Sequence, residues 1–394
     1  MRLVDNAELQ AFRAEVRDWL RANNPREQRP RGGDVAGQMA FDRAWQRTQY
    51  DGGWAGISWP KEHGGRGLTP VEQLIWSEEY ASAGCPLVHD SMWMALNHAG
   101  HTLIHCGTDE QKAFHLPRIL KGEAAWCQGF SEPGAGSDLL SLRTRGEVQG
   151  SELVVNGQKT WTTFGHMADY CELLVRTGES GGRHRGLTWV IGDMHAQGLE
   201  VRPMRALDGH LHNSECFFDD VRIPLDQVVG EIDEGWSVVL KTLEFERGGA
   251  AFSSFCQMAV HLEQLVEQAR SEPGPEGLTP AIEDARVGNR IAFARARVQS
   301  LRALMYVMVE AAERDIDLGA EGAIMHLPYT ELEQEIYSLG VDLAGPRGLI
   351  RQGGPAIGWH LLWMKSLSAT IAGGTSEIQR NTIGERLLGL PRDR

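Results

Sequence analysis

The feature that most constrains the fold of this sequence is a change of hydrophobic periodicity, from helical to strand-like and back. Up to residue 123, apolar side chains recur mostly at spacings of three and four, as on one face of a helix. Residues 124–227 contain short runs that suit strands, and helical spacing returns after them. The sequence therefore predicts an α+β protein: an N-terminal α-helical domain (1–123), a middle β domain (124–227) and a C-terminal helical bundle (228–394).

Turn and cap signals place individual elements. Thr69, followed by Pro70 and Glu72, predicts the capped start of a helix. Gln149-Gly150 and Asn156-Gly157 predict two tight turns that divide residues 147–163 into three strands. Further strands are expected at 170–176, 187–191, 199–203 and 214–218. Long helices are expected at 236–261, 285–314, 329–344 and 359–371.

Charge and composition exclude several classes of partner. The net charge of −14 argues against nucleic acid or an anionic membrane as the main partner. There is no secretory leader pattern and no run of roughly 18 apolar residues, so no membrane-spanning helix is predicted. The six cysteines are scattered without a C-x-x-C pair, which is typical of reduced thiols. We therefore expect a cytoplasmic protein.

The stretch FSEPGAGSD (Phe130–Asp138) is the first candidate for a ligand-binding turn. Its two glycines lack a Cβ and let the backbone approach a ligand closely. The hydroxyls of Ser131 and Ser137 and the backbone N–H groups of such a turn are suited to an oxygen-rich ligand. An ordinary tight surface loop is the alternative.

Three histidines, His98, His101 and His105, fall on one face of an expected helix and raise the question of a metal. No carboxylate joins them at ligand spacing, and the H-E-x-x-H pattern of zinc helices is absent. We expect packed or surface histidines and no metal.

Three stretches carry a family resemblance when they are taken together: FSEPGAGSD, NGQKTWTTFGHMADY (156–170) and IAGGTSEIQRNTIGERLLGLPR (371–392). With the order of helices, sheet and helices, they resemble the acyl-CoA dehydrogenase family along essentially the whole chain. The resemblance implies a helical N-terminal domain, a middle β-barrel and a C-terminal four-helix bundle that oligomerises. It also implies FAD as cofactor, an acyl-CoA substrate and an electron-transfer flavoprotein as acceptor.

The same resemblance assigns roles to residues of this sequence. Trp161 would lie against the flavin ring, a role that suits a large flat apolar face, and Thr163 would hydrogen-bond its polar edge. A buried strand aromatic is the alternative for Trp161. Ser137 matches a position near the pantetheine of CoA. The residues expected to bind the cofactor are Gln128, Phe130, Ser131, Trp161, Thr163, Thr375 and Glu377.

The catalytic base is the harder assignment. Many members carry a Glu directly before the Gly-Thr of the C-terminal motif, where this sequence has Gly373, which cannot take a proton. The backbone N–H of Gly373 would still donate to the thioester carbonyl. A minority of the family carries the base on an earlier helix, just before an Arg, and Glu246-Arg247 matches that pattern with Arg247 beside the substrate. Glu246 is our candidate base; Glu244 lies about 200° away around the helix. A solvated carboxylate paired with an Arg is the alternative.

Two departures concern the subunit interface. The R-x-x-F-G motif that usually reaches a neighbouring FAD is missing from the region of SEPGPEGLTP (271–280). A second motif appears in altered form at Asp342–Gly348. The pattern resembles the bacterial branch that acts on sterols and other bulky acyl groups, some of whose members are α2β2 assemblies. A homodimer or homotetramer and an α2β2 hetero-oligomer therefore stay open.

Three functions compete. The first is FAD-dependent α,β-dehydrogenation of an acyl-CoA, which needs the α-proton base that Glu246 supplies. The second is a flavin monooxygenase or nitroalkane-oxidase-like enzyme of the same fold, and the third is a non-catalytic subunit of a hetero-oligomer. The Glu246-Arg247 pair favours the dehydrogenase.

Overall fold

The computed structural model describes residues 6–25, 29–30, 34–86, 91–178, 185–246, 250–274, 277–314, 316, 320, 322–346 and 358–391, except the side chains of 91, 243–246, 250 and 251. The chain forms two compact units. We call residues 23–68 and 86–246 the sheet unit, and residues 1–22, 69–85 and 247–394 the bundle unit. This grouping joins two N-terminal segments to the C-terminal helices. The domain boundaries at residues 123 and 227 remain predictions.

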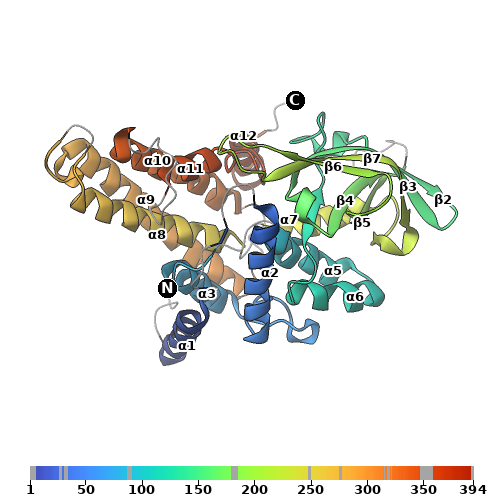
Figure 1. The fold of residues 1–394 in the computed structure, drawn as a ribbon, viewed down its shortest axis with the longest axis horizontal. Coiled ribbons are helices and arrows are strands. Elements are labelled where there is room, and N and C mark those ends of the chain that lie inside the picture. The colour runs from blue at the N-terminus through green and yellow to red at the C-terminus, as the bar shows by residue number, and fades with distance from the viewer. Residues whose placement is uncertain are drawn as a thin grey trace. The chain divides into compact units, whose positions relative to one another are not determined.

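An eight-stranded sheet forms the middle of the described chain, in the order β6-β7-β3-β2-β4-β5-β8, with β1 beside β4 (Figure 1). Its neighbours run antiparallel except where β4 meets β1 and β2. Alternating Val, Leu, Ile and Cys side chains bury one face of these strands in a common core. The strands are β1 (Trp126–Gly129), β2 (Arg145–Gln149), β3 (Glu152–Thr163), β4 (Tyr170–Arg176), β5 (Leu187–Asp193), β6 (Leu199–Met204), β7 (Asn213–Pro224) and β8 (Val228–Val229).

Helices of the sheet unit share a second core with the strands. Trp59, Trp126 and Trp189 are fully buried in it, and the indole N–H of Trp59 donates to the carbonyl of Leu96 at 2.9 Å. A π-helical turn at Ala95–Ala99 carries His98 into the interior. The helices are α2 (Val35–Asp51), α4 (Ser91–Met94), α5 (Gly100–Cys106), α6 (Asp109–Leu120) and α7 (Gly235–Glu246).

The bundle unit is helical, and its long helices α8, α9 and α10 lie side by side (Figure 1). Phe255, Met258 and Leu332 are fully buried between them. Glu79 accepts hydrogen bonds from Arg13 and Arg17 at 2.8–2.9 Å and so joins α1 to α3. The helices are α1 (Ala7–Asn23), α3 (Pro70–Ser82), α8 (Ala250–Ser271), α9 (Ala285–Ala312), α10 (Gly322–Ala344), α11 (Trp359–Ser366) and α12 (Ser376–Thr382).

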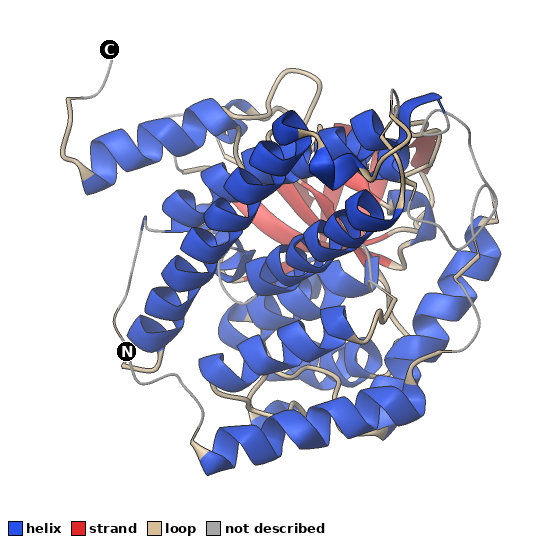
Figure 2. Cartoon of the chain, turned by 90° about the vertical axis from the view of Figure 1, so that its left-hand side faces the viewer, coloured by secondary structure: helices blue, strands red, loops and turns tan. Residues whose placement is uncertain are grey.

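The predicted α+β class is confirmed: the described chain consists of helices and a sheet (Figure 2), and all the described strands lie between the N- and C-terminal helices in the sequence. The cap at Thr69 is also confirmed, because its hydroxyl accepts the N–H of Glu72 while its own N–H donates to the Glu72 carboxylate at 2.8 Å. The turn at Gly150 separates β2 from β3, as predicted.

One predicted detail is wrong. Asn156-Gly157 is not a turn: β3 runs through it, and the pairing with β7 shifts by a bulge between Val155 and Gly157. The Asn156 side chain bonds to Asp220 on β7 instead of closing a hairpin. The helix expected over 236–261 is helical on both sides of residues 247–249, in α7 and α8, and those three residues lie outside the described part of the chain.

Two further predictions concern cysteines and membranes. All six cysteines are free thiols, as their spacing predicted. None of the helices in the described part of the chain combines the length and the apolar character that crossing a bilayer requires.

Candidate functional site

The turn Phe130–Asp138 is fixed from below by a buried ion pair. The ammonium of Lys159, which is fully buried on β3, donates to Glu132 Oε1 at 2.8 Å and to the carbonyl of Phe130 at 3.0 Å. The Glu132 carboxylate also accepts the backbone N–H groups of Arg143 and Thr144 at 2.6 and 2.8 Å. The first residues of the turn, Phe130 and Glu132, are therefore both tied to the Lys159 ammonium.

Burial and charge oppose each other in this pair. Burial lowers the pKa of Lys159 to about 8, although the Glu132 carboxylate pulls it upward. Burial raises the pKa of Glu132, but the charge and hydrogen bond of Lys159, with the N–H donors, outweigh that effect and leave it below its usual value. Glu132 and Lys159 are thus both charged at neutral pH.

The end of β3 presents an exposed indole in a strained backbone. Trp161 is 62% exposed and has φ +59°, and the buried Phe164 has φ +48°. Left-handed backbone at a residue other than Gly costs about 1–3 kcal/mol and concentrates at functional sites. Two hydrogen bonds hold the segment: Thr160 N–H to the carbonyl of Ser131 at 2.9 Å, and Phe164 N–H to the carbonyl of His212 at 2.8 Å.

Four of the predicted cofactor residues therefore meet in the sheet unit. Phe130 is buried, Ser131 and Thr163 are half-buried, and the Thr160–Ser131 bond brings the turn against the strand that carries Trp161 and Thr163. Trp161 is not the buried strand aromatic that was the alternative. Ser137 is exposed on the same turn.

Gln128 lies on β1 beside a buried histidine. Its side-chain amide lies 3.3 Å from Nδ1 of His98. Burial lowers the pKa of His98 to about 3, so the ring is neutral at physiological pH and Nδ1 can accept from that amide.

The C-terminal motif forms a glycine turn in the bundle unit. Gly373 and Gly374 have φ +67° and +106°, and the Gln379 side chain donates to the Gly373 carbonyl at 3.0 Å. Thr375 caps α12 by accepting the N–H of Ile378 at 3.2 Å, and Glu377 is exposed. The conformation at position 373 is one that Gly adopts readily and a Glu would not.

The candidate base lies on α7. Glu246 is the last described residue of that helix, but its side chain, like the whole of Arg247, lies outside the described residues. Gly373, Thr375 and Glu377 belong to the bundle unit, whereas the other predicted site residues described above belong to the sheet unit.

Sequence reasoning missed the ion pair of Lys159 and a cluster of Asp208, His210 and His212 in the loop between β6 and β7. The cluster is the one group with metal-ligand geometry among the described residues, its ligand atoms lying within 4.8 Å of one another. The alternation of Asp and His in LDGHLH was the available signal. His98, His101 and His105 form no such group in the described chain; His101 Nε2 lies 2.9 Å from the Ser58 hydroxyl.

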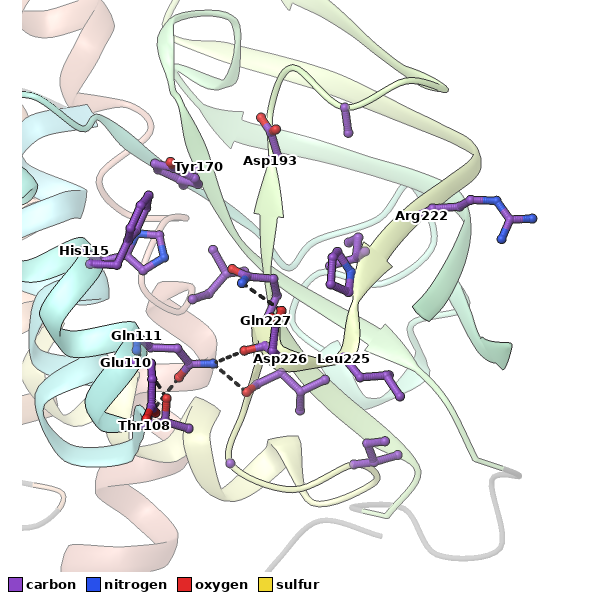
Figure 3. A pocket seen from close by; sticks show the side chains of 18 of the residues that line it. Thr108, Glu110, Gln111, His115, Tyr170, Asp193, Arg222, Leu225, Asp226 and Gln227 are labelled. Carbon is purple, nitrogen blue, oxygen red and sulfur yellow. Dashed lines mark hydrogen bonds between the residues drawn. The ribbon is translucent and has the colours of Figure 1, made fainter. Parts of the chain in front are cut away.

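A cavity of about 1060 Å³ lies elsewhere in the sheet unit, between α6 and the segment around β8 (Figure 3). The side chain of Gln111 crosses one end and donates to the carbonyls of Asp226 and Val228 at 2.7 and 2.9 Å. His115 and Tyr170 line it near their edge-to-face contact. None of the predicted site residues lines this cavity, so we do not assign the cofactor or substrate to it.

Comparison with known proteins identifies the class. The family models for the acyl-CoA dehydrogenase N-terminal, middle and C-terminal domains match residues 6–123, 127–221 and 233–388. The chain belongs to the acyl-CoA dehydrogenase family and is an oxidoreductase acting on acyl-CoA.

Individual members of this family are similar to the chain over nearly its whole length. Acyl-CoA dehydrogenase IpdE1 of Mycobacterium tuberculosis is 35% identical over 396 residues, covering 98% of this chain and 99% of the relative. Acyl-CoA dehydrogenase FadE26 of the same organism is 33% identical over 405 residues, covering 100% and 99%. Among solved structures, the Tcur3481-Tcur3483 steroid ACAD superposes with a TM-score of 0.88 at 32% identity, and the ChsE4-ChsE5 complex of M. tuberculosis with 0.84 at 32%, each covering 100% of both chains.

Proposed function

We propose that this chain is a FAD-dependent acyl-CoA dehydrogenase that introduces an α,β double bond into a bulky, steroid-sized acyl thioester. The observation that carries the proposal is the exposed, strained Trp161 beside the anchored turn at Phe130 and Ser131, within a chain of this family. The likeness to a structure named a steroid ACAD supports the substrate class.

The residues around Trp161 suit a flavin. The indole offers a flat apolar face, Ser131 and Thr163 offer hydroxyls, and the turn is held in place by Lys159 and Glu132. Gln128, Phe130, Thr375 and Glu377 complete the proposed cofactor set. When bound, FAD would accept the hydride that leaves the β-carbon.

We assign the removal of the substrate's α-proton to the carboxylate of Glu246. Glu246 lies on α7, and a carboxylate there beside the thioester would act as the general base that removal of the α-proton needs. The backbone N–H of Gly373 would donate to the thioester carbonyl and stabilise the negative charge that develops there. Ser137 and Arg247 would contact the CoA thioester.

For the assembly we propose an α2β2 hetero-oligomer in which this chain brings the base, with an electron-transfer flavoprotein as acceptor. The names of two structural relatives each pair two proteins, which supports this choice over a homo-oligomer. The altered interface stretches at 271–280 and 342–348 support it as well.

The test is anaerobic bleaching of the bound flavin with linear, branched and steroid-sized acyl-CoAs, using the purified chain alone and with its co-purifying partner. Bleaching by the steroid-sized thioester supports the proposal. Bleaching only by linear thioesters contradicts the substrate class, and a flavin that no thioester bleaches contradicts the reaction. Native mass of the active species decides between homo- and hetero-oligomer.

A further inference from the structure

The loop between β6 and β7 is closed on itself by hydrogen bonds. The N–H of Ala206 donates to the carbonyl of His210 at 2.9 Å, and the N–H of Gly209 donates to the carbonyl of Ala206 at 2.9 Å. The Arg205 guanidinium adds a bond to the carbonyl of Gly209 at 2.8 Å. These bonds give residues 205–210 one compact shape, although they belong to neither strand.

Asp208 is the centre of this loop. Its side chain is buried, and Oδ1 accepts the N–H of His210 at 3.0 Å. Its Oδ2 lies 3.1 Å from Nδ1 of His210 and 2.7 Å from Nε2 of His212. An ionised carboxylate only accepts, so both ring nitrogens carry protons and donate. Burial raises the pKa of Asp208, but these hydrogen bonds outweigh it and leave the pKa well below its usual value.

His212 connects the cluster to the end of β3. Its carbonyl accepts the N–H of Phe164 at 2.8 Å, and its ring meets the Phe164 ring edge-on at 5.7 Å between centroids. Phe164 has a left-handed backbone and follows Thr163 directly. A residue other than Gly stays in that conformation only where its surroundings enforce it.

The pairing of β3 with β7 is interrupted near Trp161, so the end of β3 needs contacts from outside the two strands to hold its conformation. The register shifts between Lys159 and Thr162, so the regular ladder is interrupted where Trp161 turns out of the strand. Pairing resumes only at Thr162 with Ser214 and Thr163 with Asn213, the residues directly after the loop. The position of His212 therefore sets where this short resumed ladder begins.

We infer that Asp208 is a positioning residue: through His210 and His212 it fixes the end of β3, so that Trp161 and Thr163 meet the flavin in a single conformation. The inference rests on the proposed function for its flavin part. The part of the inference that concerns the conformation of β3 depends only on contacts within the sheet unit.

The experiment follows Trp161 directly, by fluorine NMR of fluorotryptophan-labelled protein whose Trp161 resonance is assigned with Trp161→Phe. Asp208→Ala and His212→Leu remove the hydrogen bond between Asp208 and His212, which we call the clamp. His212→Gln and His210→Asn keep a donor N–H in place of the ring nitrogen. Asp219→Ala, an exposed acid on β7, is the matched control. Thermal melting of each variant confirms that it folds.

We expect a shifted or broadened Trp161 resonance in Asp208→Ala and His212→Leu, and a wild-type resonance in the conservative variants and the control. The Kd for FAD should rise about tenfold in the first pair, the change that 1.4 kcal/mol of lost binding free energy produces. An unmoved resonance in both folded loss variants overturns the inference. A moved resonance with unchanged FAD affinity keeps the clamp and contradicts only the flavin role of Trp161.

Discussion

The ammonium of Lys159 lies 2.8 Å from a carboxylate oxygen of Glu132, and neither group is accessible to more than a trace of water. The pair lies beneath the turn that begins at Phe130, whose carbonyl accepts a second bond from the same ammonium. The buried Lys159 ammonium therefore fixes the position of the turn relative to β3. This turn forms part of the surface on which we place the flavin.

Replacing Lys159 with Met should destabilise the protein by about 3–5 kcal/mol, because the Glu132 carboxylate loses its charged partner and keeps only two backbone N–H donors. Urea denaturation measures this difference. Lys61→Met, at an exposed lysine, is the control and should change little. The double variant Lys159→Met, Glu132→Gln should recover part of the loss; if it is as unstable as the single variant, the pair is not the cause.

The pH dependence of stability should reveal Glu132. Its pKa in the folded protein is below the ordinary 4.5, so the folded state binds fewer protons than the unfolded state just below that pH. The stabilisation is complete above 4.5 and is lost as the pH falls through the folded pKa. Denaturation curves collected downward from neutrality should show a shallower decline for Glu132→Gln. Parallel declines for both proteins would contradict this assignment.

Replacing Trp161 with Ala should weaken FAD binding by about 1–3 kcal/mol, the usual worth of stacking a planar ring on an aromatic side chain. Because Trp161 is 62% exposed, the unfolding free energy of the apoprotein should change by less than about 1 kcal/mol. Trp161→Phe should fall between wild type and Ala in affinity. Titration of apoprotein with FAD gives the Kd, and an unchanged Kd in the Ala variant would remove Trp161 from the site.

The sequence was sufficient for the order of elements because periodicity and caps are local: the capping box of Thr69 and the turn at Gly150 needed only neighbouring residues. It failed at Asn156-Gly157, where a long-range bond from Asn156 to Asp220 converts a turn signal into a bulge. The partners of Lys159 could not be predicted, because strand pairing sets them; for Asp208 the only local signal was the alternation of Asp and His in LDGHLH, and the contact of His212 with Phe164 depends on how the loop closes. The motifs located Trp161 and Gly373, but only the backbone angles revealed the strain at Trp161 and the left-handed conformation at Gly373.

A carboxylate base placed at position 373 should not work in this chain. With φ +67°, a Glu at this position costs about 1–2 kcal/mol of stability relative to Gly. The combined variant Glu246→Gln, Gly373→Glu should therefore stay inactive and melt at a lower temperature than Glu246→Gln alone. Recovery of flavin reduction in the combined variant would show that the turn tolerates a working carboxylate.

The central claim is that Glu246 takes the α-proton. The direct measurement is the rate of flavin reduction in a single anaerobic turnover of the FAD-loaded enzyme, comparing wild type, Glu246→Gln and the matched control Glu244→Gln. We predict that Glu246→Gln still binds FAD but reduces it at least about 10²-fold more slowly, the usual contribution of a general base, while Glu244→Gln stays near wild type. Flavin reduction at the wild-type rate in Glu246→Gln would contradict the account.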